Sequence, residues 1–76
     1  MEIYAEEFAH PTQASRVRLR VFQQPEGGFL VTEEWVGTAT VVKTLGLFDA
    51  RQPALEKAAA RASELARQRF APVGRA

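Results

Sequence analysis

Three arginines at alternate positions are the residues in this sequence best placed to do chemistry. Arg16, Arg18 and Arg20 alternate with apolar residues, which is the two-residue period of a half-buried strand. Such a strand carries the guanidinium groups on one face, about 6.6 Å apart, where they could contact successive phosphates. The alternative is a solvated outer face of a sheet, on which Arg18 pairs with Glu34 across two strands.

The phosphate-binding hypothesis extends to other basic and aromatic residues. Lys43 lies in a later strand-like segment, and Arg67 and Arg69 lie near the end of a helix-like segment. Trp35 is the single tryptophan; it could stack on a base if exposed, or pack under the helix if buried. The candidate nucleic-acid-binding residues are therefore Arg16, Arg18, Arg20, Trp35, Lys43, Arg67 and Arg69.

Catalytic and metal-binding patterns are nearly absent from the sequence. His10 with Glu6 and Glu7 is the one place with acid–base or metal-ligand character, and nothing else in the chain supplies further ligands. Neither serine lies in a nucleophile elbow, and the Gly27-Gly28 pair lies between strands instead of ahead of a helix. We expect a protein that is not an enzyme, with no catalytic residues, no metal and no cofactor.

The composition is that of one small soluble domain. The chain has 76 residues, of which 46% are hydrophobic and 25% charged, so a large enzyme with a deep pocket is excluded. The net charge of +1 lacks the strong basic excess of a dedicated nucleic-acid binder. Without cysteine, a signal-peptide pattern or a long apolar run, the expected location is the cytoplasm, with no membrane association.

A β-hairpin is the clearest local prediction. Strand-like segments at 16–23 and 28–36 flank Pro25-Glu26-Gly27, which suits a three-residue loop with a positive φ at Gly27. Glu33 then shares the core-facing side of its strand, so we expect it near an edge of the sheet. The predicted register pairs Val17 with Trp35, Leu19 with Glu33 and Val21 with Val31.

The remaining segments are a third strand, a helix and two ends. Residues 39–45 are rich in β-branched side chains and predict a strand. Residues 1–9 suit a strand or a helical turn equally well. Residues 71–76 are expected to form a tail, in which Ala71-Pro72 ends the helix and Gly74-Arg75-Ala76 is frayed.

Residues 53–70 predict a helix that opens on Pro53 and contains strong helix formers. Its expected apolar stripe consists of Leu55, Ala58, Ala59, Ala62, Leu65, Ala66 and Phe70. Its expected exposed face includes Glu56, Arg61, Glu64 and Arg67.

The predicted fold class is α+β, in the order β-β-β-α. An antiparallel sheet of three to four strands is packed by one C-terminal helix. The single domain 1–76 divides into an N-terminal segment (1–15), the sheet (16–48), the helix (53–70) and the tail (71–76).

The run from Phe29 to Thr38, followed by a strand, Phe48 and an Ala-rich helix ending at Phe70, resembles the WGR domain. That family is a small sheet-plus-helix module with a Trp-Gly-Arg-x-Gly turn after a central strand. It occurs in DNA-dependent poly(ADP-ribose) polymerases and small bacterial proteins, and the resemblance implies nucleic-acid binding. Trp35 and Gly37 carry over from the signature, whereas the Gly-Arg pair is missing.

Two functions follow from these observations. The main hypothesis is a small non-catalytic nucleic-acid-associated domain that contacts phosphates through its arginine strand, as the resemblance and the arginine clustering favour. The alternative is a protein–protein interaction or regulatory module, including a homodimer, which offers a strand edge or a helix face to a partner. The low net charge favours the alternative.

Overall fold

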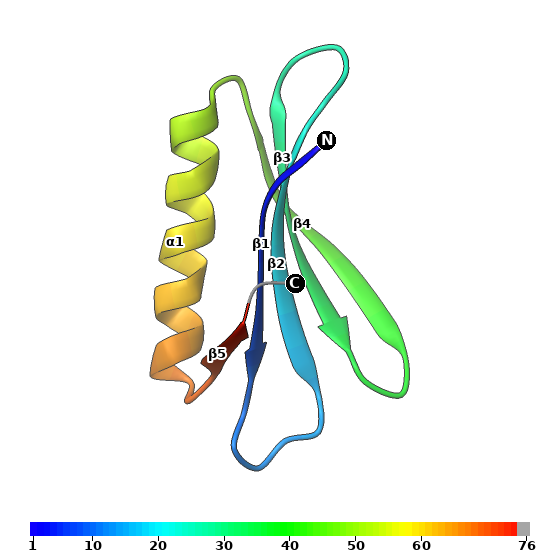
Figure 1. The fold of residues 1–76 in the computed structure, drawn as a ribbon, viewed down its shortest axis with the longest axis vertical. Coiled ribbons are helices and arrows are strands. Elements are labelled where there is room, and N and C mark those ends of the chain that lie inside the picture. The colour runs from blue at the N-terminus through cyan, green and yellow to red at the C-terminus, as the bar shows by residue number, and fades with distance from the viewer. Residues whose placement is uncertain (75–76) are drawn as a thin grey trace.

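The computed structural model describes residues 1–74, which form one five-stranded antiparallel sheet with a single helix across one face (Figure 1). The sheet order is β4-β3-β2-β1-β5. The predicted α+β class and the antiparallel sheet with one helix are confirmed, whereas the predicted number of three to four strands was too low. The elements are β1 (Glu2–Ala9), β2 (Arg16–Gln23), β3 (Phe29–Val36), β4 (Thr40–Phe48), α1 (Arg51–Arg67) and β5 (Ala71–Gly74).

The extra strand follows the helix. The prediction of a tail is wrong for Ala71–Gly74, which forms a strand that pairs with β1; residues 75–76 lie outside the described part. The chain can return because Arg69 adopts a left-handed φ of 73°, and the N–H of Phe70 donates to the Leu65 carbonyl at 3.0 Å. This cap is usually made by glycine, so an arginine there gives no sequence signal for the reversal.

The N-terminal segment and the helix boundaries also differ from expectation. The ambiguous residues at the start of the chain form β1, which lies between β2 and β5. The helix spans 51–67 instead of 53–70, and Ala50 precedes it in an extended conformation. Pro53 is therefore its third residue, where the N–H has no intrahelical acceptor and its loss costs no helical hydrogen bond.

The predicted hairpin between β2 and β3 is confirmed. The N–H of Gln24 donates to the Gly28 carbonyl at 3.0 Å, which leaves a three-residue loop. Gly27 has a φ of +94°, as expected, and Gly28 has a φ of +91°, which was not expected. The observed pairs include Val17–Trp35, Leu19–Glu33 and Val21–Val31.

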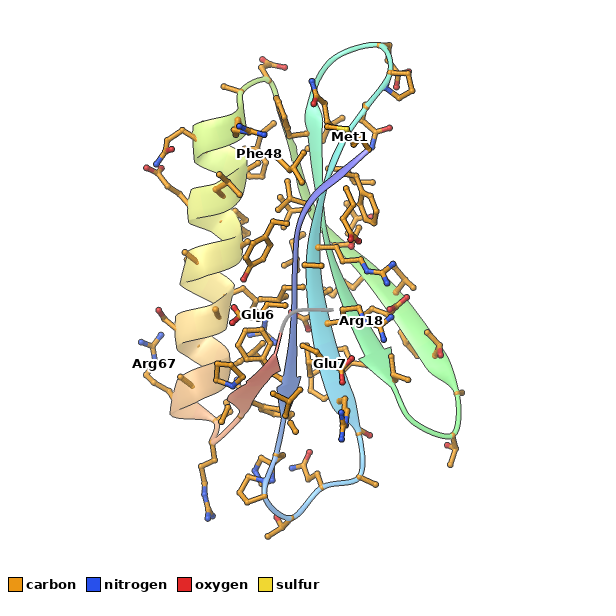
Figure 2. The ribbon with its side chains drawn as sticks, viewed as in Figure 1. Met1, Glu6, Glu7, Arg18, Phe48 and Arg67 are labelled. Atoms are coloured by element: carbon orange, nitrogen blue, oxygen red, sulfur yellow. The ribbon has the colours of Figure 1, made fainter. Side chains whose placement is uncertain are left out.

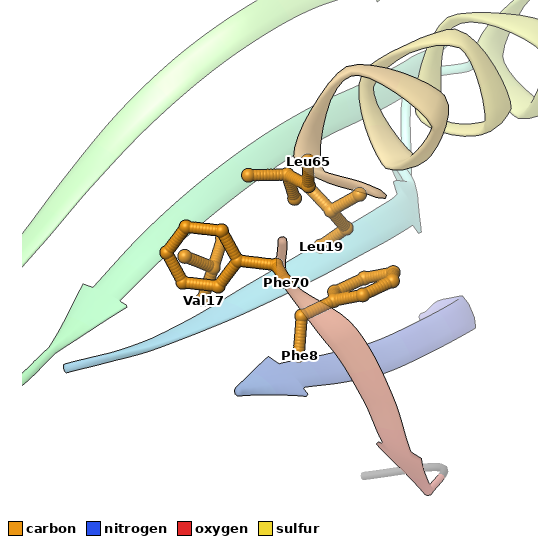
Figure 3. Packing of buried hydrophobic residues seen from close by; sticks show 5 residues of the cluster. All are labelled: Phe8, Val17, Leu19, Leu65 and Phe70. Carbon is orange, nitrogen blue, oxygen red and sulfur yellow. The ribbon is translucent and has the colours of Figure 1, made fainter. Parts of the chain in front are cut away.

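The core lies between α1 and the face of the sheet that α1 covers. One cluster, shown in Figure 3, gathers two aromatic side chains around the middle of β2 and the end of α1. A second cluster continues it toward the start of the helix. The buried residues are Phe8, Val17, Leu19, Leu65 and Phe70 in the first, and Val21, Val31, Ala54 and Ala58 in the second.

The helix is rotated relative to its predicted apolar stripe. Ala54 is buried, whereas Ala59 and Ala66, which were expected in the core, are exposed. Leu55 and Ala62 are only partly buried. Arg61, which was expected on the wet face, is partly buried and points toward the sheet.

Replacing Gly27 by valine tests the hairpin. A Cβ at this position meets nothing within 4 Å, so any cost comes from the backbone and not from a clash. Because a β-branched residue strongly disfavours positive φ, we expect Gly27→Val to lower the free energy of unfolding by at least about 1 kcal/mol, measured by urea denaturation. Gly27→Asn, which tolerates this conformation, should cost less; equal costs would contradict the backbone explanation.

Candidate functional site

The arginine stripe lies on the face of the sheet that the helix leaves uncovered. Arg16, Arg18 and Arg20 alternate along β2 with core residues, so all three point away from α1, as predicted. Figure 2 shows Arg18 on the opposite side of the sheet from the helix. The three guanidinium groups therefore share the uncovered face.

The arginines are not free, because glutamates from both neighbouring strands neutralise them. The predicted Arg18–Glu34 pair is present, with Nη1 at 2.8 Å from Oε1. Glu7 on β1 bridges Arg18 at 3.2 Å and Arg16 at 2.7 Å. Hydrogen bonds from Arg16 and Arg18 lower the pKa of Glu7 below its ordinary value, although burial opposes the shift. The carboxylate therefore holds both guanidinium groups.

Arg20 completes the stripe in a looser arrangement. Its Nε lies 3.3 Å from Oε2 of Glu2, a charge contact that lacks hydrogen-bond geometry. Its guanidinium carbon also lies 5.9 Å from the ring centre of Phe22. Three arginines thus face three glutamates on this surface, and a phosphate would have to compete with ion pairs that are already formed.

The other predicted nucleic-acid residues do not join this surface. Trp35 lies on the helix-facing side of β3, partly buried, with its ring 5.6 Å from that of Phe70 in an edge-to-face contact. Lys43 is exposed on that same side of β4, opposite Glu33. Arg67 and Arg69 are exposed at the end of the helix, and Figure 2 places Arg67 across the sheet from Arg18. Of the predicted nucleic-acid-binding residues, only the three β2 arginines therefore lie together on one surface.

The expectation that Glu33 lies near an edge is wrong. Its side chain is buried on β3, an interior strand, with 3% of its surface exposed. Arg61 reaches it from the helix through a close Nε–Oε1 ion pair and a second hydrogen bond of 3.1 Å to Oε2. The indole N–H of Trp35 donates to the same Oε2 at 2.6 Å.

This ion pair is the feature that the sequence prediction missed. The signal that could have found it is a carboxylate on the core face of a strand, which requires a cation from the facing element. Arg61 lies three residues after Ala58 and four before Leu65, on the buried side of α1. Burial acts to raise the pKa of Glu33, but the hydrogen bonds from Arg61 and Trp35 outweigh it, and the pKa is lowered.

The residues of the one predicted place with acid–base character have separate partners. His10 accepts a hydrogen bond from the Thr12 N–H at 3.1 Å and packs against Phe70, with ring centres 5.1 Å apart. Oε1 of Glu6 accepts a hydrogen bond of 2.8 Å from the Tyr4 hydroxyl. Within residues 1–74, no group of three His, Cys, Asp or Glu side chains could hold a metal ion.

The two edges of the sheet differ. β5 has four residues and contains Pro72, which lacks a backbone donor, so that edge is poorly suited to accept a strand. β4 has nine residues and no proline, and no strand of the described chain pairs with its outer side. Residues 40–44 are all exposed, including Val41 and Val42 at 61% and 59%.

Comparison with known proteins adds no relative: no family model, curated protein or solved structure matches the chain. The helix of the described part is too short and too polar to cross a membrane.

The lowered pKa of Glu33 predicts a pH dependence of stability. A carboxylate whose pKa is lower in the folded state stabilises the fold above its unfolded pKa and loses that contribution as the pH falls through its folded value. The free energy of unfolding, measured by urea denaturation, should therefore decline as the pH falls below 4.5, the ordinary pKa of a glutamate. Glu33→Gln should reduce this decline without abolishing it, because Glu7 acts in the same direction.

Glu26→Gln, in the exposed hairpin loop, controls for the loss of one negative charge. An unchanged acid slope in Glu33→Gln would show that the buried ion pair does not hold the carboxylate ionised.

Proposed function

We propose that this chain is a non-catalytic protein-interaction module that accepts a strand of a protein partner along the outer edge of β4. The observation that carries the proposal is the open edge itself: nine residues, no proline, and five consecutive exposed residues at 40–44. A long exposed edge with apolar residues is a template for strand pairing unless it is blocked. Strand addition supplies affinity through main-chain hydrogen bonds and specificity through alternate side chains.

The charge distribution supports a protein partner over a polyanion. The arginine stripe is neutralised within the sheet by Glu2, Glu7 and Glu34, and the net charge is only +1. β4 carries a single charged residue, Lys43, so it attracts neither phosphates strongly nor a strongly acidic segment. The absence of cysteine fits a cytoplasmic location, which is part of this proposal.

A photo-crosslinking amino acid at Thr44, on the exposed edge, tests the module hypothesis in the intact cell. We expect a covalent adduct with a protein. We expect Val42→Lys in the same chain to diminish it, because a second lysine beside Lys43 in the middle of the edge opposes strand addition more strongly than one. The same crosslinker at Ala60, exposed on α1, is the control and should give no matching adduct. Absence of any adduct dependent on Val42 would overturn the proposed function.

Phosphate binding through β2 is the second candidate. The observation that favours it is that all three guanidinium groups lie together on the uncovered face. The WGR resemblance, which remains a prediction, points the same way. Binding would then be weak and insensitive to sequence, with a dissociation constant of about 10⁻⁴–10⁻⁶ M at physiological salt.

Fluorescence anisotropy with short oligonucleotides tests this candidate. Replacing all three arginines by alanine should lower the salt slope by up to ~3, if each guanidinium neutralises one phosphate. Glu7→Gln should act in the opposite direction and tighten binding, because it releases Arg16 and Arg18 from their shared carboxylate. No salt-dependent binding at low ionic strength, by either the wild type or Glu7→Gln, would exclude the candidate.

A further inference from the structure

The part of β4 that is free to pair is a short regular stretch with defined ends. It begins at Thr40, after the turn from β3, and is interrupted at Leu45, where the pairing with β3 shifts register between Val31 and Thr32. Leu45 itself packs into the core. Residues 40–44 therefore form five successive exposed positions, and Val42 is the middle one.

Symmetry restricts how two copies of such an edge can pair. In an antiparallel pair, opposite residues point to the same face of the sheet. The two-fold axis must therefore pass midway between one residue and the same residue of the other copy, which lies opposite it. With the axis at Val42, all five regular positions are paired. With the axis at Val41 or Lys43, only three remain in the regular stretch, and the second choice also places two lysines opposite each other.

We propose, building on the module function above, that the partner strand is β4 of a second copy of this chain, paired antiparallel about a two-fold axis at Val42. The two sheets then join into one continuous sheet, and roughly four to six backbone hydrogen bonds form across the axis. Figure 1 shows the start of β4 splayed away from α1, so the helix does not lie along the outer side of this part of the edge.

In this register the exposed side chains of one β4 are complementary to those of the other β4. Val42 meets the other Val42, and each Thr40 meets the Thr44 of the other copy; β-branched and threonine pairs of this kind stabilise neighbouring strands. Each Lys43 lies opposite a Val41, while keeping its own neighbour Glu33 on β3. No like charges stand directly opposite each other across the axis.

The uncovered face is compatible with the same arrangement. Glu34 is the β3 neighbour of Val42 and is already paired with Arg18 at 2.8 Å. The row across the dimer therefore runs from one Arg18–Glu34 pair through two valines to the other pair. The carboxylates of the two copies are separated by both valines and are neutralised individually.

A single cysteine tests both the dimer and its register, because the chain contains no cysteine of its own. In Val42→Cys the two introduced residues face each other with Cα atoms about 4.5–5.5 Å apart, which a disulfide can span. Under mild oxidation we expect a disulfide-linked dimer to form at least roughly tenfold faster than at a control site, because the dimer holds the thiols at high effective concentration.

Val41→Cys is the matched control, since the two valines are neighbours with nearly equal exposure. In the proposed register the cysteine introduced into one copy by Val41→Cys lies about 8 Å from that of the other copy, beyond the range of a disulfide. The double variant Thr40→Cys/Thr44→Cys should crosslink, whereas each of its single variants should not. Circular dichroism confirms that each variant is folded.

Equal crosslinking at Val41 and Val42 would overturn the register. Sedimentation of the wild type as a monomer at every concentration, together with no crosslinking of Val42→Cys, would overturn self-association. If self-association is overturned but the Thr44 crosslinker forms an adduct with a different protein, the module function is supported and that protein is the partner in place of a second copy. An adduct with the same chain, lost in Val42→Lys, supports both proposals.

Discussion

The burial of one carboxylate fixes how the helix lies on the sheet. Glu33 points into the core from an interior strand, where an unpaired charge would be strongly destabilising. Arg61 must therefore face the sheet, which sets the rotation of α1. Trp35 donates a further hydrogen bond to Oε2 of Glu33, and its ring packs edge-to-face against Phe70. Phe70 follows Arg69, the left-handed residue just after the helix, so the position of β5 depends on the same set of contacts.

The sequence predicts those elements whose signals are local. Strict alternation in β2 and the composition of the loop were enough to give the hairpin, its register and the positive φ of Gly27. The helix was predictable from its composition, but its buried face was not. Hydrophobicity alone places Ala59 and Ala66 in the core and Arg61 in water, whereas the structure has the two alanines exposed and the arginine partly buried. β5 was missed since the reversal at Arg69 uses a residue that seldom adopts positive φ.

In the candidate site, too, the sequence predicts what depends on local pairing and misses what depends on tertiary contacts. The direction of the β2 arginines and the Arg18–Glu34 pair were predictable, because both follow from the hairpin register. Their neutralisation by Glu7 was not, because it depends on the pairing of β1 with β2, and nothing local decided between a strand and a helical turn at the N-terminus. The dispersion of Lys43, Arg67 and Arg69 over other surfaces is also a tertiary property, which a list of basic residues cannot reveal.

One helix covers only one face of a five-stranded sheet, so the other face must be stable in contact with water. Alternating arginines and glutamates achieve this over its middle, and their pairing weakens the positive field that a phosphate ligand would meet there. The short edge strand with its proline closes one side of the sheet. What remains is β4, whose backbone groups on the outer side have no strand of the described chain to bind. Because the β2 arginines are already paired with glutamates, the proposed partner strand would gain directional main-chain hydrogen bonds at this edge in place of screened charge contacts on the open face.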